Sequence, residues 1–239
     1  MEKLASVLWK PAEATVQQFA SALLAQAPEL AKAGAGRLRI NVVDDDVAPG
    51  EKSRYGKMDP PKDAVVFYWL DDGDLRGPVE ERLRSSSSRV ETFLVVESVP
   101  IPNTEHMAAL GERTPGFNEV TCIEPKEGLA YDEFIRFWHN EHKHCATETQ
   151  STFTYVRNEI VRAYSPDAPP WAAIVEEGFP LAALTDQREW YDWQGDEERF
   201  KKNLQWMIES CSQFLAMDKV ESHPMSEYVF EREPRPPGD

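Results

Sequence analysis

Three of the chain's five histidines lie within six positions, in the stretch FWHNEHKHCATETQ at residues 137–150. Imidazole has a proton affinity close to neutral pH, so it serves as a general base, and it is also a common metal ligand. His139, His142 and His144 could therefore form a metal site, supply a catalytic base, or be core and surface residues without a chemical role. The choice depends on how a helix would orient them.

The segment that carries the histidines has the apolar spacing of a helix, and this helix turns the three imidazoles in different directions. Phe134 and Trp138 belong to one apolar stripe, and His142 continues it four residues later, so it points inward. His139 is rotated by about 100° from Trp138, to the margin of the stripe, and His144 falls on another face. A regular helix cannot bring all three to one ion.

The spacing HNEH also differs from the HExxH pattern of zinc enzymes, and no third ligand is placed by spacing. We therefore expect no metal. Two interpretations of His142 stay open at this point: a core histidine bonded to a backbone carbonyl, and a general base in a pocket of aromatic side chains.

Composition restricts the class of partner. The 239 residues carry a formal net charge of -16, which disfavours nucleic acid and anionic membrane surfaces, because both reward clustered Lys and Arg. No run of 18 apolar residues and no cleavable leader pattern is present, so we expect a cytoplasmic protein without a membrane span. The three cysteines have no paired spacing and are expected to be buried free thiols.

A weak self-similarity at a spacing of about 115 residues indicates two copies of one unit. In each copy the pattern predicts the order β-α-β-β-α-β, the ferredoxin-like unit. The predicted fold class is α+β, with two such repeats packed sheet to sheet as an intrachain dimeric α/β barrel. The predicted boundaries are 1–104 for the first repeat, 105–116 for a connector, 117–232 for the second repeat and 233–239 for a mobile tail.

The two copies differ where chemistry could reside. The first copy has no histidine in its first helix, and its third strand has FYW at 67–69 where the second copy aligns VEE at 175–177. Adjacent carboxylates in a central strand are costly to bury, because alternation sends one to each face. In a purely structural interpretation, Glu176 or Glu177 pairs with Arg157 or Arg162 and the other reaches solvent. A functional site is expected in the second copy.

Polar residues on the second strand of that copy could face the histidine helix. Alternation places Tyr155 and Arg157 on one face and Asn158 on the other, so they cannot all face His142. Asn158 aligns with Asn41 in the copy without histidines, which favours a structural role, although it could also orient His142. Any of the three could donate a hydrogen bond to an oxyanion.

The stretch FIRFWHNEHKHCA resembles the signature of the EthD-type family in the dimeric α/β barrel superfamily, with Phe134, Trp138 and His142 matching its aromatic pair and histidine. His144 stands where the family pattern has Pro. The resemblance implies a cofactor-independent enzyme for a small aromatic or phenolic compound, and it favours His142 as the base of a lyase or dehydratase type of reaction. We expect Tyr155 and Asn158 to assist catalysis. The residues expected to bind substrate are His139, His144, Trp138, Phe134, Arg157 and Glu177.

The resemblance leaves other functions open, because relatives in the superfamily have diverse activities. The alternatives are a cofactor-free monooxygenase of an aromatic substrate, a haem-binding protein with His142 or His139 as axial ligand, and a non-catalytic module that holds a hydrophobic ligand. We expect no cofactor, and a homodimer is a possible further assembly.

Overall fold

The computed structural model describes residues 1–231, in which eight antiparallel strands close into a barrel in the order β1-β3-β2-β8-β5-β7-β6-β4. The α+β class with a barrel of antiparallel strands agrees with the sequence prediction. The strands are β1 (Glu2–Trp9), β2 (Gly36–Val42), β3 (Ala64–Leu70), β4 (Arg89–Ile101), β5 (Phe117–Ile123), β6 (Thr154–Ala163), β7 (Ala173–Phe179) and β8 (Glu221–Val229). Within each half of the chain the strands stand in the order fourth, first, third, second, and the β2–β8 and β4–β6 pairs join the halves.

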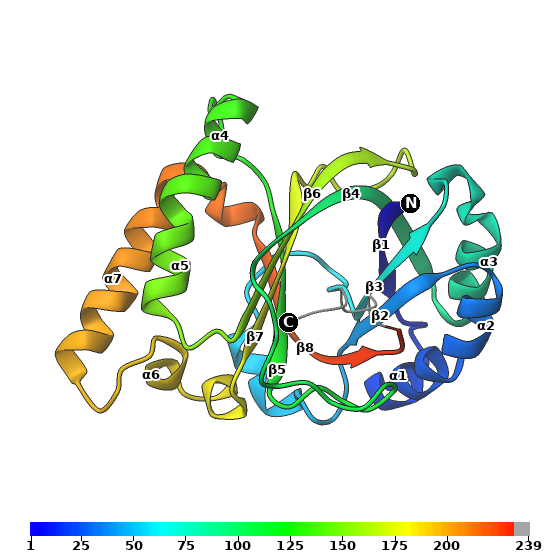
Figure 1. The fold of residues 1–239 in the computed structure, drawn as a ribbon, viewed down its shortest axis with the longest axis horizontal. Coiled ribbons are helices and arrows are strands. Elements are labelled where there is room, and N and C mark those ends of the chain that lie inside the picture. The colour runs from blue at the N-terminus through cyan, green and yellow to red at the C-terminus, as the bar shows by residue number, and fades with distance from the viewer. Residues whose placement is uncertain (232–239) are drawn as a thin grey trace, which may run out of the picture.

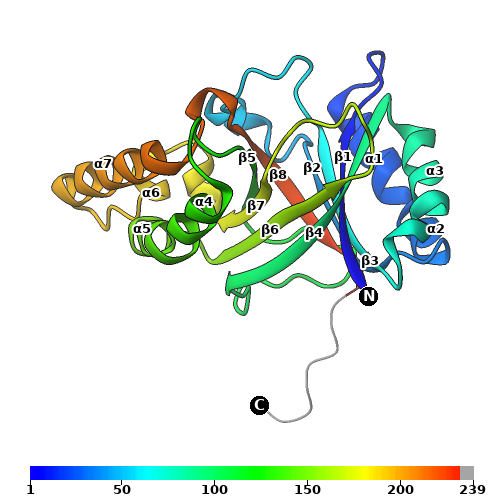
Figure 2. The ribbon, with the colours of Figure 1, turned by 90° about the horizontal axis from the view of Figure 1, so that it is seen from above.

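Helices cover the barrel on two opposite sides (Figure 1). On one side lie α1 (Val16–Ala25), α2 (Ala27–Lys32) and α3 (Gly77–Ser86). On the other side lie α4 (Tyr131–Phe137), the π-helical segment η3 (Trp138–His142), α5 (Lys143–Thr149), α6 (Gln187–Trp190) and α7 (Glu197–Phe214). The view from above shows the same separation, with the barrel between the two helical layers (Figure 2). Each strand therefore has one face toward the barrel interior and one toward helices.

Both of the first helices of the two halves are interrupted, whereas the sequence pattern predicts continuous ones. In the first half, α1 begins at a capping box of Thr15 and Gln18 and ends at Gln26, and Pro28 starts α2. In the second half, the Lys143 N–H donates to the Trp138 carbonyl, five residues back. This wider turn is a π-bulge, a feature frequent at functional sites.

Buried apolar side chains form three separate clusters. One joins the outer face of the first half's strands to α1–α3, one fills part of the barrel interior, and one joins the outer face of β5, β6 and β7 to α4, α5 and α7. In the third cluster Phe134, Trp138 and Phe214 pack ring against ring, with centroids 5.7 Å apart in each contact to Phe134. This aromatic contact fixes α4 and η3 against α7.

A charged network occupies the polar part of the barrel interior. The Glu176 carboxylate accepts from Arg39 Nη2 at 2.9 Å and from Asn158 Nδ2 at 3.0 Å, and it lies 3.7 Å from Lys3 Nζ. Lys3 also pairs with Glu97. The structural interpretation, in which one of Glu176 and Glu177 pairs with Arg157 or Arg162, does not hold for Glu176: Arg157 points to the opposite face of β6, and Arg162 lies exposed at the far end of that strand.

We expect Arg39→Met to lower the free energy of unfolding by about 3 kcal/mol, because it leaves the buried Glu176 carboxylate short of a partner. The matched control is Arg162→Met, which removes an exposed ion pair and should leave the free energy of unfolding almost unchanged. Urea denaturation of both variants measures the difference. Equal losses in the two variants would contradict a structural role for the interior network.

Candidate active site

A cavity of about 170 Å³ lies between the outer face of β5, β6 and β7 and the helices of the second half. The groups from the sheet include Glu119, Tyr155 and Glu177, and those from the helical side include Trp138, His142, Tyr191, Met207, Cys211 and Phe214. Four residues that the sequence singled out, His142, Trp138, Tyr155 and Glu177, therefore line one cavity. The third apolar cluster forms its floor.

His142 ends the π-helical segment and is buried with its ring against the cavity wall. Its Nδ1 lies 2.9 Å from Ser210 Oγ on α7, and its ring centroid is 4.7 Å from that of Phe214. In residues 1–231 no protein group hydrogen-bonds its Nε2. Burial lowers the pKa of His142 to about 4, because the buried ring loses the water that would stabilise its charged form. At neutral pH the imidazole is uncharged.

Trp138 and Tyr155 form a polar contact in an otherwise apolar wall. The Trp138 indole N–H donates to the Tyr155 hydroxyl at 2.8 Å, and both side chains are almost completely buried. Burial raises the pKa of Tyr155 far above its usual range, so its hydroxyl stays protonated. The hydroxyl proton of Tyr155 remains available to an acceptor in the cavity.

Two carboxyl groups stand side by side on the sheet wall. Glu119 on β5 is directly opposite Glu177 on β7 in the antiparallel register, and both line the cavity. Residues paired in this way have Cβ atoms roughly 5 Å apart. Glu119 Oε1 accepts from Ser222 Oγ at 2.6 Å, whereas its Oε2 is buried and lacks a hydrogen-bond partner. In the described chain, Glu177 has neither a hydrogen bond nor an ion pair to its carboxyl group.

Burial raises the pKa of both groups. It moves the pKa of Glu177 to about 7 and that of Glu119 to about 8, where the hydrogen bond from Ser222 offsets part of the rise and the charge of Glu177 adds to it. Because neighbouring carboxylates resist ionising together, the pair holds about one proton near neutral pH. This pair is the strongest acid–base feature of the cavity.

A wider groove of about 780 Å³ adjoins the cavity, and Glu119, Trp190, Tyr191 and Ser222 line both. Its other wall comes from the first half of the chain, from the loop that contains the 3-10 helix η1 (Ala48–Ser53). The groove thus leads from solvent to the carboxyl pair.

The other predicted site residues lie outside the cavity. Asn158 points into the barrel interior, where it bonds Glu176 and Lys3, so it is on the opposite face of the sheet from His142. Phe134 is fully buried in the third cluster. The positions of Phe134 and Asn158 favour structural roles. They do not support the substrate-binding role expected for Phe134 or the catalytic role expected for Asn158.

His139, His144 and Arg157 are also separate from the cavity lining. His139 Nε2 lies 3.2 Å from Glu159 Oε1, and His144 is exposed with Nδ1 3.5 Å from Glu148. Arg157 donates from Nε to Ser98 Oγ at 3.0 Å. The π-helical turn leaves only His142 of the three histidines on the cavity.

Sequence reasoning missed Glu119 and Ser210. A signal for Glu119 was present, because it stands two and four residues before Thr121 and Ile123 on β5, and alternation puts all three on the cavity face. Nothing in the local pattern of α7 distinguishes Ser210 from its neighbours. Its role follows only from the packing of α7 against η3.

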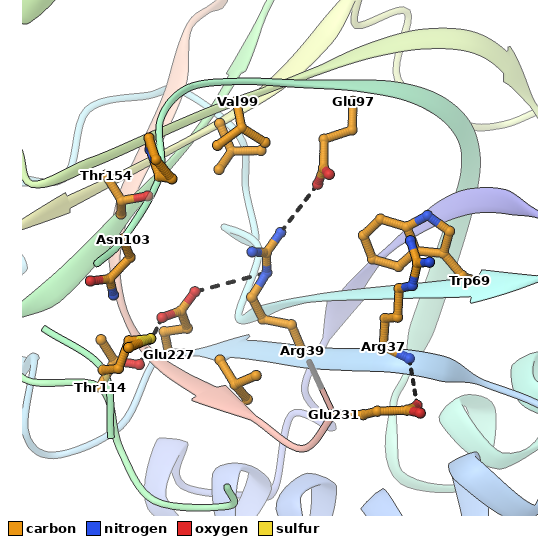
Figure 3. A pocket seen from close by; sticks show the side chains of 14 residues that line it. Arg37, Arg39, Trp69, Glu97, Val99, Asn103, Thr114, Thr154, Glu227 and Glu231 are labelled. Atoms are coloured by element: carbon orange, nitrogen blue, oxygen red, sulfur yellow. Dashed lines mark hydrogen bonds and ion pairs between the residues drawn. The ribbon is translucent and has the colours of Figure 1, made fainter. Parts of the chain in front are cut away.

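A second cavity, of about 240 Å³, opens at one mouth of the barrel (Figure 3). Its charged groups are already paired: Arg39 lies between Glu97 and Glu227, and the Arg37 backbone N–H donates to Glu231. Groups that bond each other in this way are poorly placed to bind or transfer a proton to a ligand. The carboxyl pair therefore defines the better candidate site.

Comparison with known proteins gives a fold. No family model matches the sequence, and no curated protein matches it. The solved structure of an anthrone oxidase-like protein aligns with 97% of this chain and 94% of its own, with a TM-score of 0.54 and 9% identity. The fold is that of a dimeric α/β barrel. A candidate monooxygenase from Lactobacillus acidophilus aligns with 96% of this chain and 96% of its own at a TM-score of 0.46 and 9% identity.

Residues 1–231 contain neither a cluster of metal ligands nor a membrane-spanning helix. No group of three or more His, Cys, Asp or Glu side chains is arranged to hold a metal ion. No helix in that range combines the length and apolar character that a membrane crossing requires.

We expect His142 to remain uncharged down to about pH 4, because its ring is buried without an anionic partner. Imidazole NMR shifts, followed from pH 8 to pH 4, measure this directly. The His142 signals are identified by their loss in His142→Gln. A midpoint at the ordinary histidine value would contradict the assigned environment.

Proposed function

We propose that this protein is an enzyme that binds a small aromatic or phenolic compound in the 170 Å³ cavity and removes a proton from it. The observation that supports this most is the Glu177 carboxyl group, which faces the cavity without a partner and whose pKa burial raises to about 7. A general base is most effective when its pKa lies near the working pH.

The size of the cavity supports a single aromatic ring. A cavity of about 150 Å³ in a protein core holds benzene, so a phenol ring fits the space between Trp138, Phe214 and the sheet. The larger part of a substrate would extend into the 780 Å³ groove. Haem does not fit the 170 Å³ cavity that His142 lines, because drug-sized ligands already require roughly 300–1,000 Å³. The residues present therefore do not support the haem-binding alternative.

The proposal changes the roles that the sequence suggested. With a pKa of about 4, His142 is a weak base, and its Nδ1 is engaged by Ser210. Its Nε2 and the Tyr155 hydroxyl are positioned to hydrogen-bond a ring substituent, whereas Glu177 takes the proton. Glu119 provides a second carboxyl group that can return a proton to the product or pass it to the groove.

Proton removal is the first step of two reaction classes. In a lyase or dehydratase reaction the resulting carbanion or phenolate expels a leaving group. In a cofactor-free oxygenation the electron-rich phenolate reacts with O₂. We propose the lyase class, and consumption of dissolved oxygen during turnover would identify the oxygenase instead.

We also propose the finer fold and family assignment. The strand order in each half supports two ferredoxin-like repeats at 1–104 and 117–232. Phe134, Trp138 and His142 follow one another from the aromatic core to the cavity, which supports an EthD-type second repeat.

We expect Glu177→Gln to lower kcat/KM by about 10²–10⁴-fold, the usual contribution of a general base. Wild-type kcat/KM should rise with pH through about 7, since only the ionised carboxyl group accepts a proton. The measurement is a screen of single-ring phenols by liquid chromatography and mass spectrometry, followed by a pH profile. Glu148→Gln, at an exposed position on α5, is the matched control and should leave the rate unchanged.

The other groups around Glu177 should not obscure this profile. Burial raises the pKa of Cys211 to about 12 and takes those of Tyr155 and Tyr191 higher still, and it lowers that of His142 to about 4. Only the pair with Glu119 titrates near neutrality, as two macroscopic steps. Infrared difference spectra of wild type and Glu177→Gln follow the protonated carboxyl band without any substrate. A Glu177 midpoint near 4 would refute the proposed base.

A further inference from the structure

Arg54 lines the wide groove together with Glu119, one member of the carboxyl pair. The chain directly after it is attached to β8 by the Tyr55–Ser222 bridge, in which the Tyr55 N–H donates to the Ser222 carbonyl at 2.9 Å and the Ser222 N–H donates to the Tyr55 carbonyl at 2.7 Å. Ser222 lines both the groove and the cavity. The bridge thus places Arg54 next to Tyr55, which pairs with Ser222 where the groove meets the cavity.

A second set of contacts fixes the same loop. The Tyr55 hydroxyl donates to the Met217 carbonyl at 2.9 Å, and the backbone N–H groups of Lys57 and Met58 donate to Glu221. The backbone that follows Arg54 is therefore held by the second half of the chain. Its side chain is half-buried and lines the groove.

The charge of the Arg54 guanidinium acts on Glu119 and Asp63 through space. Across residues 1–231 no hydrogen bond or ion pair engages it, although the chain carries 42 Asp and Glu residues. Of the two acidic residues that line the groove, Asp186 caps α6, where its carboxylate accepts from the Arg188 N–H at 2.8 Å. Glu119 is largely protonated at neutral pH. A half-buried guanidinium without a partner is a ready receptor for an oxyanion, which its planar set of donors matches.

We infer that Arg54 binds an oxyanion group of the substrate, so that the substrate is an aromatic compound bearing a carboxylate or a phosphate monoester, with its ring in the cavity and its anionic end in the groove. The position of the ring rests on the proposed function, whereas the anion contact does not. Lys52, exposed on the same groove wall, adds a second positive charge. On a chain of net charge -16, these cations oppose the repulsion that an anionic substrate would meet.

The test is binding, measured by isothermal titration calorimetry at pH 7.5. The ligands are 4-hydroxycinnamate, its uncharged amide 4-hydroxycinnamamide, and 4-hydroxyphenethyl phosphate. We expect wild type to bind the carboxylate at least about tenfold more tightly than the amide, the size of a charged hydrogen-bond contribution. A still stronger preference for the phosphate would assign the anion as a phosphate monoester.

Variants locate the contact. Arg54→Gln should remove the preference for the anion and leave the affinity for the amide unchanged, and Arg54→Lys should keep part of it, because charge is retained but the fork of donors is lost. Lys202→Gln, at an exposed position on α7 outside the groove, is the matched control and should change the preference by less than about twofold. A preference that persists in Arg54→Gln, or a wild type that binds the ligands equally or not at all, overturns the inference.

This result is distinguishable from a failure of the proposed function. Glu177→Gln should keep the preference for the anion, since Arg54 is intact. If no phenol is turned over but the preference depends on Arg54, the proposed enzyme activity fails and the anion site stands. If Glu177 is the base but Arg54→Gln binds like wild type, the activity stands and the anion site fails.

Discussion

The closed sheet is the constraint on which the rest of the structure depends. Because β4 pairs with β6 and β2 with β8, every strand has one face in the barrel interior and one under helices. Neighbouring residues on a strand are therefore sent to two separate compartments. The adjacent pair Glu176 and Glu177 shows the result: the first is neutralised by Arg39 and Lys3 from the other half of the chain, and the second faces the cavity without a partner.

The two carboxylates of that pair have opposite consequences. Glu176 joins strands of both halves through its partners, so it contributes to holding the barrel together. Glu177 has a folded-state pKa above its ordinary value of 4.5, so its ionised form disfavours folding. Below about pH 4.5, Glu177 is protonated in both the folded and the unfolded chain and does not destabilise the fold. The free energy of unfolding falls as the pH rises through about 7. A group that weakens the fold near neutral pH is better explained by chemistry than by stability.

Much of the fold was predictable because apolar periodicity reports which face is buried. The order of strands and helices, the barrel of antiparallel strands, and the inward position of His142 all follow from it. The alignment of FYW with VEE, however, was one residue out, since Trp69 faces the barrel interior and Glu177 faces the helices. A shift of one residue exchanges the two faces of a strand, and the weak similarity of the repeats could not exclude it.

The site was less predictable because its groups meet only in three dimensions. Glu119 and Glu177 are brought together by strand register, and Ser210 reaches His142 because α7 packs on η3. The groove needs residues of the first half, whose own outer face is filled with hydrocarbon. The copy without histidines therefore supplies more than a packing partner for the barrel. Its loop at Arg54 and Tyr55 forms one wall of the groove that adjoins the cavity, a wall that the second half alone would lack.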